Sequence, residues 1–235
     1  MLACAGSSGS ASTSAIATTA PASTSTTFAG TSTSTSTTTT SPTTTAAPAY
    51  SATIYEVDEA RLAHSYTPDC PVVVDDLVMI GLNHWGLDGA VHRGDIVVAR
   101  SRGNDVVEIF RRLFEIGYPV HSVIPIGDLP EGIEDDDPDY NNTSGLHCRY
   151  VAGTTTWSEH AKGLAIDINP FLNPFITQGE IWPANAGKYR DRTLGEPGMI
   201  VAGDEVVGAF AESGWHWGGY WESSKDYHHF SVTGR

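Results

Sequence analysis

The most informative stretch of the sequence is Ser158-Glu159-His160-Ala161-Lys162-Gly163-Leu164-Ala165-Ile166-Asp167-Ile168-Asn169-Pro170. Apolar side chains alternate with other residues over 164–168, which is typical of a short strand with one face in a core. Asp167 lies on the opposite face, beside the small Ala165. Gly163 allows a turn before the strand, so His160 can fold back toward Asp167. The stretch therefore predicts a buried strand with an imidazole and a carboxylate close together.

The end of the chain offers further groups of the same chemistry, in Lys225-Asp226-Tyr227-His228-His229-Phe230. Imidazole and carboxylate groups are good zinc ligands, and a catalytic zinc site typically has three protein ligands and one position for water. It also needs a carboxylate that is not a ligand, to take the proton of the water. We predict the ligands His160, Asp167 and His229, with Asp226 as general base. The residues alone leave ordinary surface or hydrogen-bonded roles open.

A family resemblance appears at these residues. From Ser158 to Asp167 the sequence follows the pattern Ser-x-His-x2-Gly-x-Ala-x-Asp without deviation. The pattern resembles that of the zinc D-alanyl-D-alanine carboxypeptidases and L-alanyl-D-glutamate endopeptidases, which cut the peptides of bacterial peptidoglycan. The resemblance covers about residues 70–231 and favours the endopeptidase-like branch. It also rests on Asn141-Asn142-Thr143-Ser144, Cys148-Arg149, Asp167-Ile168-Asn169-Pro170, Asn173-Pro174, Gly214-Trp215-His216-Trp217-Gly218-Gly219 and Asp226-Tyr227-His228-His229-Phe230.

The resemblance implies a role for each matching residue. The implied ligands of one zinc ion are His160, Asp167 and His229. Asp226 is the implied general base, in place of the glutamate of the dipeptidase branch. Arg149 matches an arginine that contacts the scissile carbonyl or its developing oxyanion, and Ser158 matches a serine that helps to hold the substrate. The implied fold is α+β, the hedgehog/DD-peptidase fold, with a small antiparallel sheet and flanking helices.

The function predicted in this way is that of a zinc metallopeptidase. We expect it to hydrolyse peptide bonds of peptidoglycan stem peptides, with L-Ala-D-Glu endopeptidase-like activity. One alternative is a D-alanyl-D-alanine carboxypeptidase. Others are a non-catalytic, zinc-stabilised cell-wall binding domain and a wall-anchored structural lipoprotein. The presence of both Asp226 and Arg149 disfavours a pure binding domain, which needs neither.

Two positions depart from the family pattern. Ser231 stands where a glutamate is common after the final His-Phe. If that glutamate orients the ligand histidine, the metal affinity is lower here. His228 stands where glutamine is common, which makes a second metal contact conceivable, although on a regular strand His228 would point away from His229.

Two helices follow from apolar periodicity. The first spans about 104–116, and its inward face consists of Val106, Ile109, Phe110, Leu113 and Phe114. We expect Asn104 to cap it, Glu108 and Arg112 to pair on it and Gly117 to end it. The second helix spans about 204–213, between Asp204 and Gly214. Helices and strands are mixed without a regular repeat, which favours the α+β class.

Strands and loops are predicted from shorter patterns. A strand or strand start is expected at 71–74, and the chain continues apolar over 77–81. Strands are also expected at 95–99 after a turn at Gly94, at 119–124 and within the aromatic-rich segment 215–232. Residues 127–157 read as a polar loop. Its acidic run at 134–139 lacks the spacing of an EF-hand, so we interpret it as a solvated loop and not as a calcium site.

The first fifty residues differ in composition from the rest. Residues 5–50 consist almost entirely of Ser, Thr, Ala, Gly and Pro and cannot bury enough apolar surface to fold. We predict a truncated leader and Ser/Thr-rich disordered stalk at 1–50 and a zinc metallopeptidase domain at 51–235.

Cys4 ends a Leu-Ala-Cys sequence like that of a lipoprotein signal, so either it carries a lipid or it is a chance cysteine. Cys70 and Cys148 form either a disulfide or two free thiols.

Charge and hydropathy restrict the partners. The chain has 28 acidic and 13 basic residues, a net charge of −15, and no basic stripe for a nucleic-acid backbone. No apolar run reaches the ~18 residues that a membrane helix needs. We expect a monomer that acts on peptidoglycan stem peptides outside the cell or in the envelope of a bacterium, with a membrane tether if Cys4 is lipidated.

Overall fold

The computed structural model describes residues 47–235. The predicted leader and stalk, with Cys4, lie outside the described residues except for 47–50, so that division stays a prediction. The described part mixes a few helices with small, mainly antiparallel sheets, which agrees with the α+β class. The specific likeness to hedgehog domains stays a prediction. Within this part of the chain, no helix combines the length and the apolar character that crossing a membrane requires.

The longest strands form an antiparallel sheet near the N-terminal end of the described part. Strands β1 (Ala52–Tyr55), β2 (Leu77–Trp85) and β3 (Val91–Ala99) pair in the order β1-β2-β3. The predicted turn at Gly94 is wrong, because this glycine lies inside β3, opposite Leu82. A Cβ atom at Gly94 would lie 2.4 Å from the carbonyl oxygen of Val123, so the position requires glycine for close approach and not for a turn.

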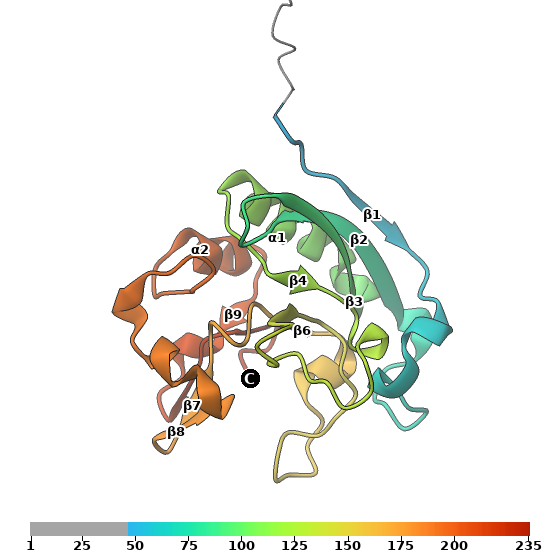
Figure 1. Ribbon diagram of the computed structural model, residues 1–235. Helices are drawn as coiled ribbons and strands as arrows, with labels where there is room; N and C mark the ends of the chain where they lie inside the picture. Colours follow the sequence, from blue (N-terminus) through green and yellow to red (C-terminus); the bar gives the residue numbers. More distant parts are fainter. Residues whose placement is uncertain (1–46) are drawn as a thin grey trace, which may run out of the picture. The chain divides into compact units, whose positions relative to one another are not determined.

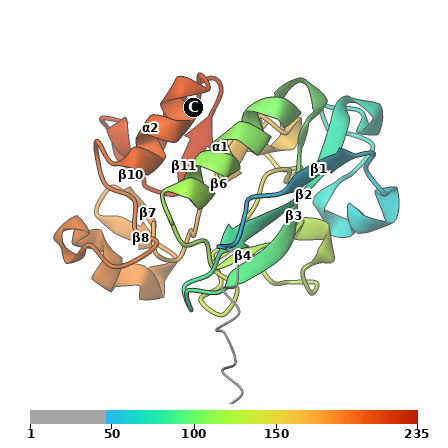
Figure 2. The same ribbon diagram turned by 90° about the horizontal axis from the view of Figure 1, so that it is seen from above.

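Two helices pack beside this sheet. Helix α1 (Gly103–Glu115) contacts both β2 and helix α2 (Glu205–Glu212), and it lies between them in the views of Figures 1 and 2. The predicted inward face is confirmed, because its five apolar side chains are all buried. Gly117, with φ +70°, follows the end of α1, and Asp204 caps α2 by accepting a hydrogen bond from the Val207 amide.

Three smaller sheets complete the fold. Strands β6 (Ala165–Asp167), β11 (His229–Ser231) and β9 (His216–Trp217) pair in the order β6-β11-β9. Strands β10 (Ser224–Asp226), β7 (Phe175–Thr177) and β8 (Glu180–Trp182) pair in the order β10-β7-β8. Strand β4 (Ser122–Val123) pairs in parallel with β5 (Asn142–Thr143). Ile166 and Phe230 extend one core from the long sheet and both helices to the β6-β11-β9 sheet.

Several local predictions are wrong or only partly right. Residues 71 and 72 form bends and Val74–Asp76 forms a short 3-10 helix, so the strand begins only at Leu77. The strand predicted at 119–124 is reduced to β4. The aromatic segment 215–232 contains three short strands and a 3-10 turn. In each of these segments the apolar residues predict a longer strand than the one that the structure contains.

The predicted capping and pairing of α1 are also wrong. Arg102 occupies the N-cap position without a side-chain cap, and Asn104 lies inside the helix. Glu108 pairs with Arg111 instead of Arg112. Arg112 pairs with Glu212 of α2, so a contact between helices replaces the expected contact along one helix.

A disulfide joins Cys70 to Cys148, with 5.8 Å between the Cα atoms and 78 residues of sequence separation. Of the two alternatives for these cysteines, the bonded one is therefore confirmed. The bridge anchors the start of the segment that continues through Arg149 toward Ser158.

Candidate metal centre

Strand pairing brings two of the predicted ligands together. In the β6-β11 register, Asp167 lies directly opposite His229, and side chains at directly opposed positions lie on the same face of a sheet. Asp167 is fixed further by a backbone bridge to Ser144, with hydrogen bonds of 3.0 and 3.1 Å in both directions. Two segments far apart in sequence thus present a carboxylate and an imidazole at one point.

The third predicted ligand comes from a tight turn before β6. His160 lies in a 3-10 helix, Glu159–Lys162, which ends at Gly163 with φ +67°. A Cβ atom at Gly163 would lie 2.5 Å from the backbone nitrogen of Ala99, so both the left-handed backbone and the close approach require glycine. The predicted return of His160 toward Asp167 is confirmed.

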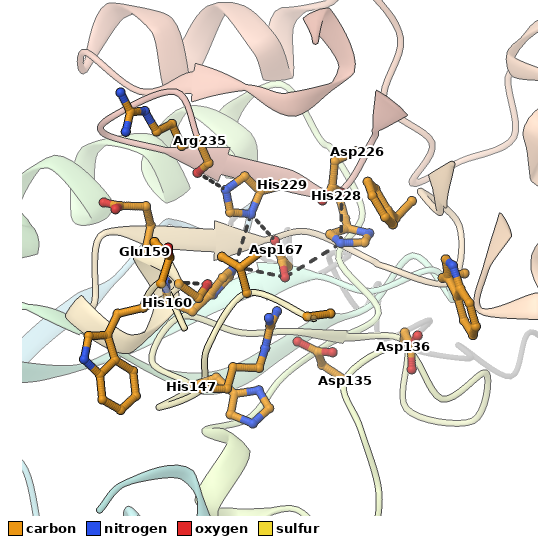
Figure 3. Close-up of a pocket in the computed structure, with 18 of the residues that line it drawn as sticks. Asp135, Asp136, His147, Glu159, His160, Asp167, Asp226, His228, His229 and Arg235 are labelled. Atoms are coloured by element: carbon orange, nitrogen blue, oxygen red, sulfur yellow. Dashed lines mark hydrogen bonds and ion pairs between the residues drawn. The ribbon is translucent and has the colours of Figure 1, made fainter. Parts of the chain in front are cut away.

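The three side chains converge on one point (Figure 3). The Nε2 atom of His160 lies 3.1 Å from Asp167 Oδ2 and 3.1 Å from His229 Nδ1, and His229 Nδ1 lies 3.0 Å from Asp167 Oδ1. A tetrahedral zinc site with bonds of about 2.0–2.1 Å separates its ligand atoms by about 3.3 Å. The three side chains are buried, with residue exposures of 2, 3 and 6%. The cluster therefore has the donor atoms and the spacing to hold a metal ion.

Backbone carbonyls fix both ligand imidazoles from behind. His160 Nδ1 lies 2.7 Å from the carbonyl oxygen of Gly145, and His229 Nε2 lies 2.9 Å from that of Arg235. A backbone oxygen can only accept, so each of these nitrogens carries a proton. The other nitrogen of each ring faces the cluster and is the one available to a metal ion. Two such nitrogens and a carboxylate at one buried point favour a cation between them, either a proton or a metal ion, which supports a metal site.

The electrostatics of the cluster agree with this reading. Burial by itself raises the pKa of Asp167, but the neighbouring His160 and His228 hold it well below its usual range. Burial lowers the pKa of His229, but the hydrogen bond and charge of Asp167 outweigh it and raise that pKa. Asp167 is therefore a carboxylate that attracts positive charge.

Asp226, the predicted general base, lies at the end of β10 close to this cluster (Figure 3). Its Oδ1 atom lies 2.9 Å from His228 Nε2 as an ion pair. The contact is close but poorly aligned for a hydrogen bond, so this buried oxygen is ion-paired with His228 and lacks a well-aligned donor among the described residues. A buried carboxylate oxygen of this kind can accept from a further donor, such as water or a substrate.

His228 also faces the site, contrary to the expectation that it would point away. Strand β11 begins only at His229, so strand alternation does not govern His228. Its Nδ1 atom lies 2.7 Å from the Asn173 carbonyl oxygen, and its Nε2 atom lies 3.8 Å from Asp167 Oδ2. Burial lowers the pKa of His228, but Asp226 and Asp167 outweigh it and raise that pKa to about 10. His228 contacts the candidate base, and the three-residue cluster does not include it.

A cavity of about 760 Å³ opens over the cluster, and both remaining predicted site residues line it. The Arg149 side chain is exposed and makes no hydrogen bond or ion pair within the described part of the chain. Ser158 is buried, and its hydroxyl accepts a 3.3 Å hydrogen bond from the His160 amide. Ser158 therefore shapes the turn that carries a candidate ligand, in addition to facing the cavity.

Two acidic residues of this cavity were interpreted wrongly from the sequence. Asp135 and Asp136 belong to the acidic run that was expected to be solvated, yet both are half-buried in the cavity wall. Ser144 donates a 2.7 Å hydrogen bond to Asp135, and burial together with the charge of Asp167 raises the pKa of Asp135. No local pattern predicts this, because the loop is placed by its contact with Ser144 and not by its own composition.

Aromatic side chains form much of the remaining wall. Trp157, Phe175, Trp182 and Trp221 line the cavity. Trp157 stacks on Tyr150 across a narrow hairpin, with 3.9 Å between ring centroids. Trp182, at the end of β8, is 52% exposed and is available to a bound molecule.

Comparison with known families agrees with this geometry. Residues 152–232, which contain the cluster and Asp226, match a family model described as D-alanyl-D-alanine carboxypeptidase. Residues 152–232 are therefore similar to this peptidase family, and the similarity supports a hydrolase. Neither the comparison with curated proteins nor that with solved structures gives a match.

Proposed function

We propose that this protein is a zinc peptidase that hydrolyses peptide bonds in peptidoglycan stem peptides. The observation that carries the proposal is the convergence of His160, Asp167 and His229 on one point at 3.0–3.1 Å, with the buried carboxylate of Asp226 beside them. Those three side chains would be the zinc ligands. Bound zinc lowers the pKa of a water molecule toward ~7 and polarises a carbonyl group.

The protein's own groups account for the proton transfers. The Asp226 carboxylate accepts the proton of the attacking water and returns it to the leaving amine. Arg149, which has no acidic partner in the described structure, donates to the oxyanion that develops on the scissile carbonyl. A well-placed donor of this kind contributes about 3–4 kcal/mol to the transition state. Ser158 keeps the turn at His160 in place and lines the cavity where the peptide binds.

The charge of the cavity supports an endopeptidase of the L-Ala-D-Glu type. Its acidic lining residues are Glu134, Asp135, Asp136, Glu159, Asp167 and Asp226, and its basic ones are Arg149, Lys162 and Arg235. Lys162 is already bound to Glu159 at 2.6 Å. A carboxypeptidase must bind the free terminal carboxylate of its substrate. With the zinc ligands, the Asp226–His228 pair and the Glu159–Lys162 pair set aside, three acidic residues (Glu134, Asp135 and Asp136) face two basic ones (Arg149 and Arg235), and this excess of negative charge opposes carboxylate binding.

A D-alanyl-D-alanine carboxypeptidase is the second candidate, because the family description names this activity. Mass spectrometry of muropeptides after incubation with the zinc-loaded protein distinguishes the two. We expect cleavage between L-Ala and D-Glu. Release of terminal D-Ala alone would establish the second candidate, and the absence of any cleavage would favour a binding domain. We further propose that the enzyme is a monomer that acts in the envelope or outside a bacterial cell.

A further inference from the structure

We propose that Ser231 and the Arg235 backbone form a clamp that holds His229 as a metal ligand, a positioning role that rests on the proposed zinc site. The Ser231 hydroxyl binds both ends of one residue: it accepts from the Arg235 amide at 3.0 Å and donates to the Arg235 carbonyl at 2.8 Å. The same carbonyl accepts the Nε2 proton of His229 at 2.9 Å (Figure 3). We call Ser231 and the Arg235 backbone the C-terminal clamp.

The clamp is built on a rigid base. Ser231 is fully buried in β11, where it lies opposite Ala165 on one side and His216 on the other. Because β11 is the central strand of its sheet, the hydroxyl has a fixed position. The hydroxyl therefore holds the main-chain oxygen of Arg235 at a fixed position relative to the sheet, and this oxygen orients His229.

Trp221 holds the same segment from a second direction. Its indole nitrogen donates a 3.0 Å hydrogen bond to the carbonyl of Gly234, the residue before Arg235. Its ring also lies against His229, with 5.5 Å between the ring centroids. The segment after β11 is thus folded back over the ligand.

The chemical consequence concerns the tautomer of His229. An acceptor at Nε2 places the proton there and leaves the Nδ1 lone pair directed at Asp167 and His160. Loss of the group that accepts a hydrogen bond from a metal-binding histidine typically lowers metal affinity by about 10–100-fold. Serine thus serves here by fixing a main-chain oxygen as the acceptor, where a glutamate in the resembling family would offer its side chain.

The test is the zinc dissociation constant of the full chain, measured by competition with a chromophoric chelator. Ser231→Ala and removal of Gly234 and Arg235 should each weaken zinc binding by about 10-fold or more. Two matched controls in the same segment, Thr233→Ala and Arg235→Ala, should stay within about twofold, since the clamp uses neither the exposed Thr233 nor the Arg235 side chain. Circular dichroism of each metal-free variant checks that the fold is kept.

The outcomes separate the clamp from the zinc site itself. Wild-type protein that binds one zinc tightly, with Ser231→Ala and the deletion both within twofold of it, would overturn the clamp and leave the proposed function standing. An effect of Arg235→Ala as large as that of the deletion would also overturn it, because the side chain would then be the active part. Wild-type protein without affinity for zinc would instead overturn the proposed function. A second readout is ¹⁵N NMR of the metal-free protein, in which His229 should carry its proton on Nε2 and lose this preference in Ser231→Ala.

Discussion

The two candidate histidine ligands receive the same support from very different parts of the molecule. His160 donates to the carbonyl of Gly145, and a Cβ atom at Gly145 would lie 2.3 Å from the Val97 carbonyl oxygen, so this acceptor is packed against the long sheet. His229 donates to the carbonyl of Arg235, an exposed residue that Ser231 holds in place. One half of the site is thus fixed by the core and the other by a short segment folded back on β11.

Loss of either imidazole should give the largest decrease in zinc affinity and in activity. Equal decreases would show that both halves of the site are needed for metal binding. We expect His160→Ala and His229→Ala each to reduce zinc affinity by several orders of magnitude, because two ligands cannot replace three. Hydrolysis of a stem peptide should fall to background in both. Chelator competition and a peptide cleavage assay measure the two effects, and a variant that keeps wild-type affinity would remove its histidine from the ligand set.

Asp226→Asn should separate catalysis from metal binding. The amide keeps the shape of the side chain but cannot accept a proton, so turnover should fall by about 10²–10⁴-fold. Zinc affinity should change by less than about threefold, because Asp226 is outside the three-residue cluster. Single-turnover cleavage and zinc titration on the same preparation give both numbers, and wild-type turnover in this variant would show that another group is the base.

Arg149→Ala should affect the half of the site that the core fixes, without loss of metal. Removing one donor to the oxyanion lowers kcat by about 10²–10³-fold. Zinc affinity should remain unchanged, and so should activity in Arg93→Ala, which removes an exposed arginine on β3 outside the cavity. A change in KM with an unchanged kcat would assign Arg149 to substrate binding alone.

The disulfide should give the smallest change in activity and a clear change in stability. The double variant Cys70→Ser/Cys148→Ser opens a loop closed over 78 residues, which should lower the free energy of unfolding by about 4 kcal/mol. Cys148 immediately precedes Arg149, so kcat should fall more than zinc affinity does. Urea unfolding and steady-state kinetics test this, and equal losses of kcat and zinc affinity would show that the bridge supports the ligands as well.

The parts of the site that were predictable from sequence depend on local patterns. The alternation around Asp167, the glycine after His160 and the apolar face of α1 each depend on chain geometry over a few residues. These patterns were sufficient to choose the cluster and to place both helices.

The parts that were not predictable depend on contacts between distant segments. His228 faces the site because β11 starts one residue later and the Asn173 carbonyl holds its ring. Asp135 lines the cavity because Ser144 binds it, and the strand periodicity at 71–74 gives way to a 3-10 helix before β2. Ser231 in place of a glutamate predicts lower metal affinity from the sequence alone, because its hydrogen bond to Arg235 is known only from the folded structure.

The most direct test of the proposed zinc centre is a titration of zinc into the metal-free protein, with cleavage of a peptidoglycan stem peptide followed by mass spectrometry at each point. Activity should rise from background and reach its plateau at one zinc ion per chain, and zinc-loaded Asp226→Asn should remain near background. Full activity without metal, or no cleavage at one equivalent of bound zinc, would contradict the assignment of His160, Asp167 and His229 as the centre of a zinc peptidase.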